Sequence, residues 1–395
     1  MGELRDVVFV SGVRTAIGTF GGTLKDIPPT KLGAAVVREA VRRAGIEAGE
    51  VGSIVFGHII NTEPRDMYMA RVAGIDGGLA IETPALTVNR LCGSGLQAVI
   101  SAAQQILLGD VGIAIAGGAE TMSRAPYTIP SERWGQKMGD AKVIDMLLGT
   151  LSDPFGHGHM GITAENLSAK WNISRDDQDA FALASHQRAA KAREAGYFKD
   201  QILPFEIDGK KGKTLFDHDE HIRTDVTAEN LRSLKPVFKK DGTVTAGNAS
   251  GINDGAAALV MMEANLAAMK GLKPLARPVA YGVAAVEPSE MGIGPVPAVH
   301  NAMKKAGLSI SDMDVIESNE AFAAQALAVA RNLGFDPAKT NPNGGAVALG
   351  HPVDASGAIL TIKAIYELKR TAKRYALITL CIGGGQGIAA VIENL

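Results

Sequence analysis

Cysteine is scarce in this chain, whose 395 residues contain only Cys92 and Cys381. Two cysteines so far apart cannot form a disulfide framework, and the short ligand spacings of a zinc site are missing from the sequence. We therefore expect both thiols to be free, in a reducing compartment, and we expect no metal site.

Excess charge of either sign is missing too, because 40 Lys and Arg face 42 Asp and Glu, a formal net charge of −2. This balance indicates neither a nucleic-acid nor a membrane partner. No signal-type segment opens the chain, and no apolar run reaches the roughly 20 residues of a membrane span. The expected location is the cytoplasm.

Aromatic residues make up only 5% of the chain, although 46% of it is hydrophobic. The interior must therefore be built mainly from Ala, Val, Ile and Leu. The 46 glycines imply many tight turns between regular elements. The length allows two or three domains with ample core.

Segments of the first half recur in the second half at a constant offset of 262 residues. Residues 40–46 (AVRRAGI) align with 302–308 (AMKKAGL), and Ser94-Gly95 aligns with Ser356-Gly357. Chance similarity between alanine-rich helices would not keep one offset, so we interpret the pattern as a duplication. Each copy has an amphipathic helix, a glycine stop, a short apolar strand and a glycine-rich turn into another helix, which is typical of an α/β fold.

Between the copies lies a more polar stretch that holds both tryptophans, Trp134 and Trp171. We interpret this stretch as an insertion into the first copy. The predicted units are an N-terminal half made of residues 1–121 and 252–274, an inserted loop domain made of residues 122–251, and a C-terminal half made of residues 275–395.

Cys92 stands in the glycine-rich segment 89–95 (NRLCGSG), after the apolar strand 85–88 and before a helix expected from Gly95 to Leu107. Amides and the dipole at a helix N-terminus can lower a thiol pKa from about 8.5 to roughly 3.5–7.5. We therefore expect the Cys92 thiolate to be favoured. The plainer alternative is a buried structural cysteine.

Three further segments carry groups that a nucleophilic thiol needs. Asn319 lies in 318–322 (SNEAF), His351 in 343–352 (NGGAVALGHP) and Cys381 in 381–387 (CIGGGQG). Taken singly, Asn319 reads as a helix cap and His351 as a hydrogen-bonded turn residue.

Together the four segments resemble the thiolase family in order and spacing, and the resemblance covers essentially the whole chain. Within that family the chain is similar to bacterial acetyl-CoA acetyltransferases and broad-specificity β-ketothiolases. The resemblance implies two duplicated βαβαβαββ halves in a five-layered α/β/α/β/α arrangement, with the inserted loop domain over the active site. The resemblance also implies a homotetramer built as a dimer of dimers, with residues 124–146 in the region that forms the tetramer contacts.

The implied reaction forms or cleaves short-chain β-ketoacyl-CoA, such as acetoacetyl-CoA, by ping-pong Claisen chemistry through an acyl-Cys92 intermediate. His351 resembles the base that activates Cys92 and then, with a water on Asn319, holds the thioester oxygen. Cys381 resembles the second acid/base, and the amides of Cys92 and Gly383 resemble the other oxyanion hole. A separate group is needed because Cys92 is blocked as a thioester when the α-proton is removed.

Acetyl-CoA, CoA and β-ketoacyl-CoA are then substrates, and no cofactor is expected. The resemblance assigns ten residues to the CoA arm, its nucleotide and the acyl tunnel: Leu151, His159, Met160, Arg223, Phe238, Ala246, Ser250, Met291, Ala321 and Phe322. His157 and His159 flank one glycine, but no Cys, Asp or Glu nearby completes a metal site.

Two positions depart from the family pattern. Asp354 stands where thiolases generally have glycine, and we expect it either to cap the following helix or to raise the pKa of His351. Asn230 stands where some relatives have a serine near the nucleotide.

Two other functions stay open from the sequence. A decarboxylating condensing enzyme shares the fold and the nucleophile, but typically has a histidine or asparagine in place of Cys381. A non-catalytic acyl-CoA-binding scaffold is the other alternative. The sequence fixes neither the acyl length nor the direction of reaction, so polyhydroxyalkanoate precursor synthesis and fatty acid breakdown are both compatible with it.

Overall fold

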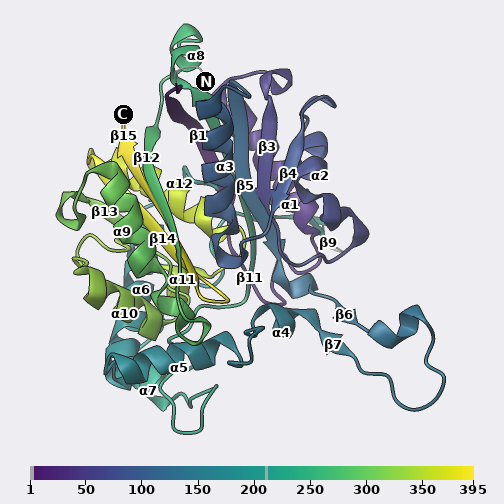
Figure 1. The fold of residues 1–395 in the computed structure, drawn as a ribbon, viewed down its shortest axis with the longest axis vertical. Coiled ribbons are helices and arrows are strands. Elements are labelled where there is room, and N and C mark those ends of the chain that lie inside the picture. The colour runs from purple at the N-terminus through teal and green to yellow at the C-terminus, as the bar shows by residue number, and fades with distance from the viewer. Residues whose placement is uncertain (1–3, 210–211) are drawn as a thin grey trace.

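The computed structural model describes residues 4–209 and 212–395 and shows two α/β halves that pack against each other (Figure 1). The sheet of the N-terminal half has the strand order β4-β3-β5-β11-β1. Its strands are β1 (Val7–Thr15), β3 (Ser53–Gly57), β4 (Ala85–Val88), β5 (Ile113–Thr121) and β11 (Asn253–Glu263), with short β2 (Gly18–Thr19) and β8 (Ile202–Leu203) at its margin. β3 runs parallel to β4 and β5, while β11 is antiparallel to β1 and β5.

The sheet of the C-terminal half repeats this plan with the order β12-β15-β14-β13. Its strands are β12 (Ala276–Ala285), β13 (Val315–Ser318), β14 (Tyr375–Ile382) and β15 (Gln386–Asn394). A parallel bridge between Ile316 and Thr340 stands where the first half has β4. The two sheets meet where β1 touches β12, at Phe9 and Ala276.

Helices form the layers around and between these sheets. The central layer contains α3 (Ser94–Leu108) and α12 (Ser356–Thr371), which pack against each other. The outer layers contain α1 (Pro29–Ala44), α2 (Met69–Asp76) and α8 (Ala264–Met269) on one side, and α9 (Pro295–Ala306) and α10 (Ala323–Leu333) on the other. The predicted five-layered α/β/α/β/α arrangement is confirmed.

The internal repeat is visible in helix ends. α1 ends at Ala44 before Gly45, and α9 ends at Ala306 before Gly307. Both glycines have φ = 67°, a left-handed conformation that ends a helix at little cost only for glycine. The equivalent residues lie 262 positions apart, so the predicted duplication is confirmed.

The central helices approach so closely that only glycine fits at their first turns. A Cβ on Gly357 would lie 2.2 Å from the backbone nitrogen of Leu96, and a Cβ on Gly95 would lie 2.6 Å from the carbonyl oxygen of Asp354. These glycines are the repeat-related pair found in the sequence. Their contact places the segment before α3, which carries Cys92, beside the segment before α12.

η3 and α3 together, residues 91–108, are long and apolar enough to pass a compositional test for a membrane span. This stretch occupies the central layer between the two sheets, and its apolar side chains belong to the main hydrophobic core. A core helix in that position is expected to be apolar on most of its surface.

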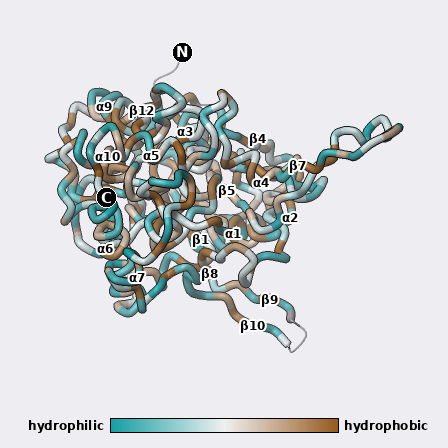
Figure 2. Tube along the Cα trace, turned by 90° about the horizontal axis from the view of Figure 1, so that it is seen from below, coloured by the Kyte–Doolittle hydropathy of each residue, from teal (hydrophilic) through white to brown (hydrophobic). Residues whose placement is uncertain are grey.

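The stretch after β5 leaves the N-terminal half and returns as β11. It contains α4 (Met146–Thr150), α5 (Met160–Lys170), α6 (Arg175–Glu194), α7 (Ala228–Ser233) and the hairpins β6 (Tyr127–Thr128)/β7 (Ile144–Asp145) and β9 (Phe205–Gly209)/β10 (Gly212–Phe216). The segment between β6 and β7 projects from the body (Figure 2). The exact domain boundaries stay a prediction.

Short helical turns connect the remaining elements: η1 (Ala48–Glu50), η2 (Pro64–Tyr68), η3 (Leu91–Gly93), η4 (Met122–Arg124), η5 (Pro130–Arg133), η6 (Pro288–Ile293), η7 (Ile310–Asp312) and α11 (Ala346–Leu349). Of these, η3 and the turn after α11 carry the reactive side chains described next.

Candidate active site

A cavity of about 420 Å³ lies where the two halves meet the inserted stretch. Cys92, His351, Cys381 and Gly383 all line it, although they come from segments up to 291 residues apart. Cys92 comes from the turn before α3, His351 from the turn between α11 and α12, and Cys381 and Gly383 from the end of β14. The fold therefore brings together the reactive groups that the sequence singled out.

Cys92 lies in η3, the short turn that joins β4 to α3. Leu91 before it has φ = 45°, a left-handed conformation that is uncommon for leucine. This tight turn places the partly exposed Cys92 at the cavity wall and next to the first turn of α3.

The ring of His351 is buried and held on both sides. Its Nδ1 lies 2.6 Å from Oγ of Ser356, and its Nε2 lies 3.3 Å from Nδ2 of Asn319. Its backbone amide donates to Oδ1 of Asn253 at 2.8 Å. Burial lowers the pKa of His351 to about 4, so the imidazole is neutral at neutral pH and can accept a proton.

Asn319 follows β13 and is buried behind His351 rather than in the cavity lining. Its backbone amide donates to the carbonyl of Thr379 at 2.9 Å, which fixes it against β14. The helix-cap interpretation is wrong, because α10 begins at Ala323 after Phe322 with no side-chain cap. The side-chain amide of Asn319 is directed to His351 instead.

The protonation state of the thiols differs from the sequence expectation. Although Cys92 is partly exposed, desolvation by the surrounding protein raises its pKa to about 11, against the hydrogen bonds from the amides of Gly383 and of Cys92 itself. Burial, and then the nearby Cys92, also raise the pKa of Cys381. The raised pKa of Cys92 is opposite in direction to the lowered pKa expected from the sequence, because desolvation outweighs the hydrogen bonds from the two amides.

Both interpretations of Asp354 were also wrong. α12 begins after Ala355 without a side-chain cap, and burial is the cause of the lowered pKa of His351. The Asp354 carboxylate instead accepts a hydrogen bond from the amide of Ala119, at 2.9 Å, across the junction of the two halves. It faces the N-terminal half rather than His351.

The cavity is mainly apolar, as an acyl and pantetheine site should be. Nine of the ten residues assigned to CoA and acyl binding line it: Leu151, His159, Met160, Phe238, Ala246, Ser250, Met291, Ala321 and Phe322. Arg223 is not in the lining and has an exposed side chain. Asn230 is also exposed, in α7.

His159 and Phe238 form one wall of this cavity, with ring centroids 4.6 Å apart in a stacked arrangement. Nδ1 of His159 accepts the amide proton of Gly161 and so caps α5. His157 lies instead near Glu287, at 3.7 Å. The two histidines thus have separate partners.

Sequence reasoning missed Ser356 and Asn253, the two residues that hold His351. A signal for Ser356 was present, because the repeat places it opposite Ser94, whose hydroxyl likewise ties the turn before its helix by accepting from Arg90 and donating to Leu91. Asn253 offered no such signal, since it opens β11 almost a hundred residues before His351.

Known proteins match this chain along nearly its whole length. The family profiles named "Thiolase, N-terminal domain" and "Thiolase, C-terminal domain" match residues 7–265 and 272–394. The chain is 62% identical over 392 residues to "Beta-ketothiolase BktB" of Cupriavidus necator, covering 99% of this chain and all of the relative.

Solved structures agree with this match. The acetyl-CoA acetyltransferase of Bacillus anthracis superposes with a TM-score of 0.98 at 47% identity, over 100% of both chains. The human mitochondrial 3-ketoacyl-CoA thiolase in complex with CoA superposes with a TM-score of 0.96 at 45% identity, over 100% of this chain and 99% of that chain.

Proposed function

Because this chain belongs to the thiolase family, we propose that it is an acyl-CoA:acetyl-CoA C-acyltransferase that forms or cleaves short-chain β-ketoacyl-CoA. The convergence of Cys92, Cys381 and His351 on one apolar cavity carries the proposal. Cys92 takes the acyl group, and Cys381 moves the proton at the α-carbon. The decarboxylating alternative is not favoured, because Cys381 is a thiol.

In the first step, Cys92 attacks the thioester carbonyl while His351 takes its proton. A thiol with a pKa of about 11 does not give its proton to an imidazole with a pKa of about 4 at rest. Proton transfer therefore accompanies the attack. As the new carbon–sulfur bond forms, the pKa of the S–H group falls and His351 can take its proton. The amides of Cys92 and Gly383 serve the oxyanion that develops.

CoA leaves the first step as a thiol with the proton of Cys381. In the second step, the Cys381 thiolate abstracts the α-proton of acetyl-CoA, the enolate attacks acyl-Cys92, and the Cys92 sulfur leaves with the proton held by His351. Burial, and then the nearby Cys92, raise the pKa of Cys381, so this thiol is protonated at rest and can give its proton to the leaving CoA. Because acylation occupies the Cys92 sulfur, Cys381 is the thiol that remains to move the α-proton.

The apolar lining supports an acyl tunnel between Met160, Met291 and Phe322, with the pantetheine arm along Ala246 and Ser250. Arg223 is exposed and suits the nucleotide part of CoA outside the cavity. We also propose a cytoplasmic homotetramer without a bound organic cofactor, which supplies either polyhydroxyalkanoate precursors or fatty acid breakdown.

The assay that tests this function mixes the protein with acetoacetyl-CoA and free CoA and follows loss of the enolate absorbance. We expect thiolysis to acetyl-CoA, and turnover that falls once the β-ketoacyl chain outgrows the tunnel. Tight CoA binding without turnover would support the scaffold alternative, and consumption of malonyl thioesters would support the decarboxylating one.

A further inference from the structure

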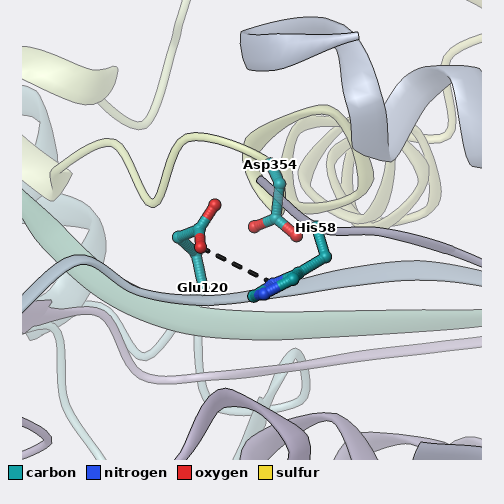
Figure 3. A group of neighbouring side chains, drawn as sticks. All are labelled: His58, Glu120 and Asp354. Atoms are coloured by element: carbon teal, nitrogen blue, oxygen red, sulfur yellow. Dashed lines mark ion pairs between the residues drawn. The ribbon is translucent and has the colours of Figure 1, made fainter. Parts of the chain in front are cut away.

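A second group of reactive side chains lies outside the catalytic cavity, at the junction of the two halves (Figure 3). His58 follows β3, Glu120 belongs to β5, and Asp354 precedes α12. One ligand-type atom from each residue lies within 4.8 Å of the other two. None of the three lines the cavity that contains Cys92.

All three side chains are buried, with exposed fractions of 4% for His58 and 0% for Glu120 and Asp354. One atom of each is satisfied by the backbone: Nδ1 of His58 by the carbonyl of Ala119, Oε1 of Glu120 by the amide of Ile60, and Oδ2 of Asp354 by the amide of Ala119. Among residues 4–209 and 212–395, the remaining atoms, Nε2, Oε2 and Oδ1, have no hydrogen-bond partner. Such atoms are rare in a folded interior unless a ligand or proton satisfies them.

The charges in this group are also unbalanced. Within the described part of the chain, no lysine or arginine forms an ion pair with Glu120 or Asp354, and the one basic atom paired with Glu120 is Nδ1 of His58, 3.6 Å from Oε1. Figure 3 shows the two carboxyl groups facing each other. Two adjacent buried carboxylates without a counter-ion are strongly unfavourable, so the group requires a cation or a proton.

The histidine favours the cation. A hydrogen bond from Nδ1–H of His58 to the Ala119 carbonyl leaves Nε2 unprotonated. A backbone carbonyl that holds the other ring nitrogen is the usual support of a metal-binding histidine. A neutral imidazole and two carboxylates would balance the two charges of a divalent ion.

We propose that His58, Glu120 and Asp354 bind one divalent transition-metal ion, with donors that suit Zn²⁺ or Mn²⁺ better than Mg²⁺. The ion would tie β3 and β5 of the N-terminal half to the segment before α12, three residues after His351. Asp66, held by Thr62 and Glu63, adds negative potential to this site. The role is structural, and the ion takes no part in the Claisen step.

To test this proposal, untagged full-length protein is dialysed against Zn²⁺, Mn²⁺ or Mg²⁺, and the bound metal is then measured by mass spectrometry. We expect one equivalent of Zn²⁺ or Mn²⁺ per chain and a raised melting temperature, with little Mg²⁺. His58→Gln and Glu120→Gln should each lower retention by about tenfold or more. Asp354→Gly, which removes the second carboxyl group of the site, should do the same. Asp254→Asn, at a buried carboxyl outside the group, should retain the metal.

Metal retained equally by the wild type and Asp354→Gly would overturn the proposal, since binding would then lie elsewhere. Absence of bound metal would overturn it too. In that case an infrared band of a protonated carboxylic acid, lost in Glu120→Gln, would identify a shared proton as the counter-charge.

Discussion

Nδ1 of His351 and the hydroxyl of Ser356 lie 2.6 Å apart. Ser356 donates its own proton to the carbonyl of Pro352, at 2.7 Å, so it accepts the proton of His351 Nδ1. This arrangement fixes the tautomer with Nε2 unprotonated, where it accepts a hydrogen bond from Nδ2 of Asn319 at 3.3 Å and can take up a proton. Ser356 is therefore a positioning residue for the proposed base.

Ser356→Ala should lower kcat for acylation by about 10- to 100-fold with a much smaller change in KM, because general base catalysis loses its oriented acceptor. Single-turnover acylation with acetyl-CoA measures this step. Thr361→Val, which removes another buried hydroxyl of α12 that bonds only the Gly357 carbonyl, is the matched control. Equal acylation rates in Ser356→Ala and the wild type would contradict the assignment.

The raised pKa of Cys92 predicts slow alkylation at neutral pH. Because the thiolate is the nucleophile, the rate with iodoacetamide should rise about tenfold per pH unit from pH 7 towards its pKa of about 11. Mass spectrometry of the modified peptide separates Cys92 from the fully buried Cys381. A rate that levels off near pH 7 would show that the helix N-terminus outweighs burial after all.

Two buried histidines make the fold sensitive to acid. Burial is the main cause that lowers the pKa of His186 and of His351 to about 4 from the ordinary 6.5. As the pH falls, the two histidines take up protons in the unfolded chain before they do so in the folded chain. Their contribution to the free energy of unfolding is therefore fully present above pH 6.5 and is lost as the pH falls towards 4. The loss amounts to about 3 kcal/mol for His186, at about 1.4 kcal/mol per unit.

Denaturant titrations between pH 7.5 and pH 4.5 measure this loss. His186→Gln should flatten the decline in unfolding free energy, whereas His300→Gln, at an exposed position on α9, should leave it unchanged. An equally steep decline in His186→Gln and the wild type would contradict the prediction.

The close contact between the central helices predicts that replacing Gly357 lowers the stability of the fold, whereas replacing a glycine without close neighbours does not. Gly357→Ala places a Cβ 2.2 Å from the Leu96 backbone, and overpacking of this kind costs about 1–3 kcal/mol or more. Thermal unfolding should show a clear decrease in melting temperature. Gly49→Ala, where a Cβ meets nothing within 4 Å, should have little effect. A Gly357→Ala protein as stable as the wild type would mean that the helices can separate freely.

The repeat in the sequence was enough to predict the two halves, because Ala40 to Ile46 and Ala302 to Leu308, and Ser94-Gly95 and Ser356-Gly357, keep the same offset. It did not predict that α3 packs against α12, because an internal repeat does not show which faces of the two copies meet. The reactive thiols and His351 were also recognisable, since each stands in a glycine-rich turn. Their pKa values were not, because the depth of burial depends on side chains from distant segments. The group of His58, Glu120 and Asp354 was hidden for the same reason, as its members are 62 and 234 residues apart.

The account rests on a division of work between two sulfurs, and trapping of radiolabelled acetyl-CoA tests it most directly. Cys381→Ala should retain about one equivalent of label as an acyl-enzyme and form no acetoacetyl-CoA, because its nucleophile is intact and its second base is missing. Cys92→Ala should retain no label. Label retained on Cys92→Ala, or acetoacetyl-CoA formed by Cys381→Ala at the wild-type rate, would contradict the account.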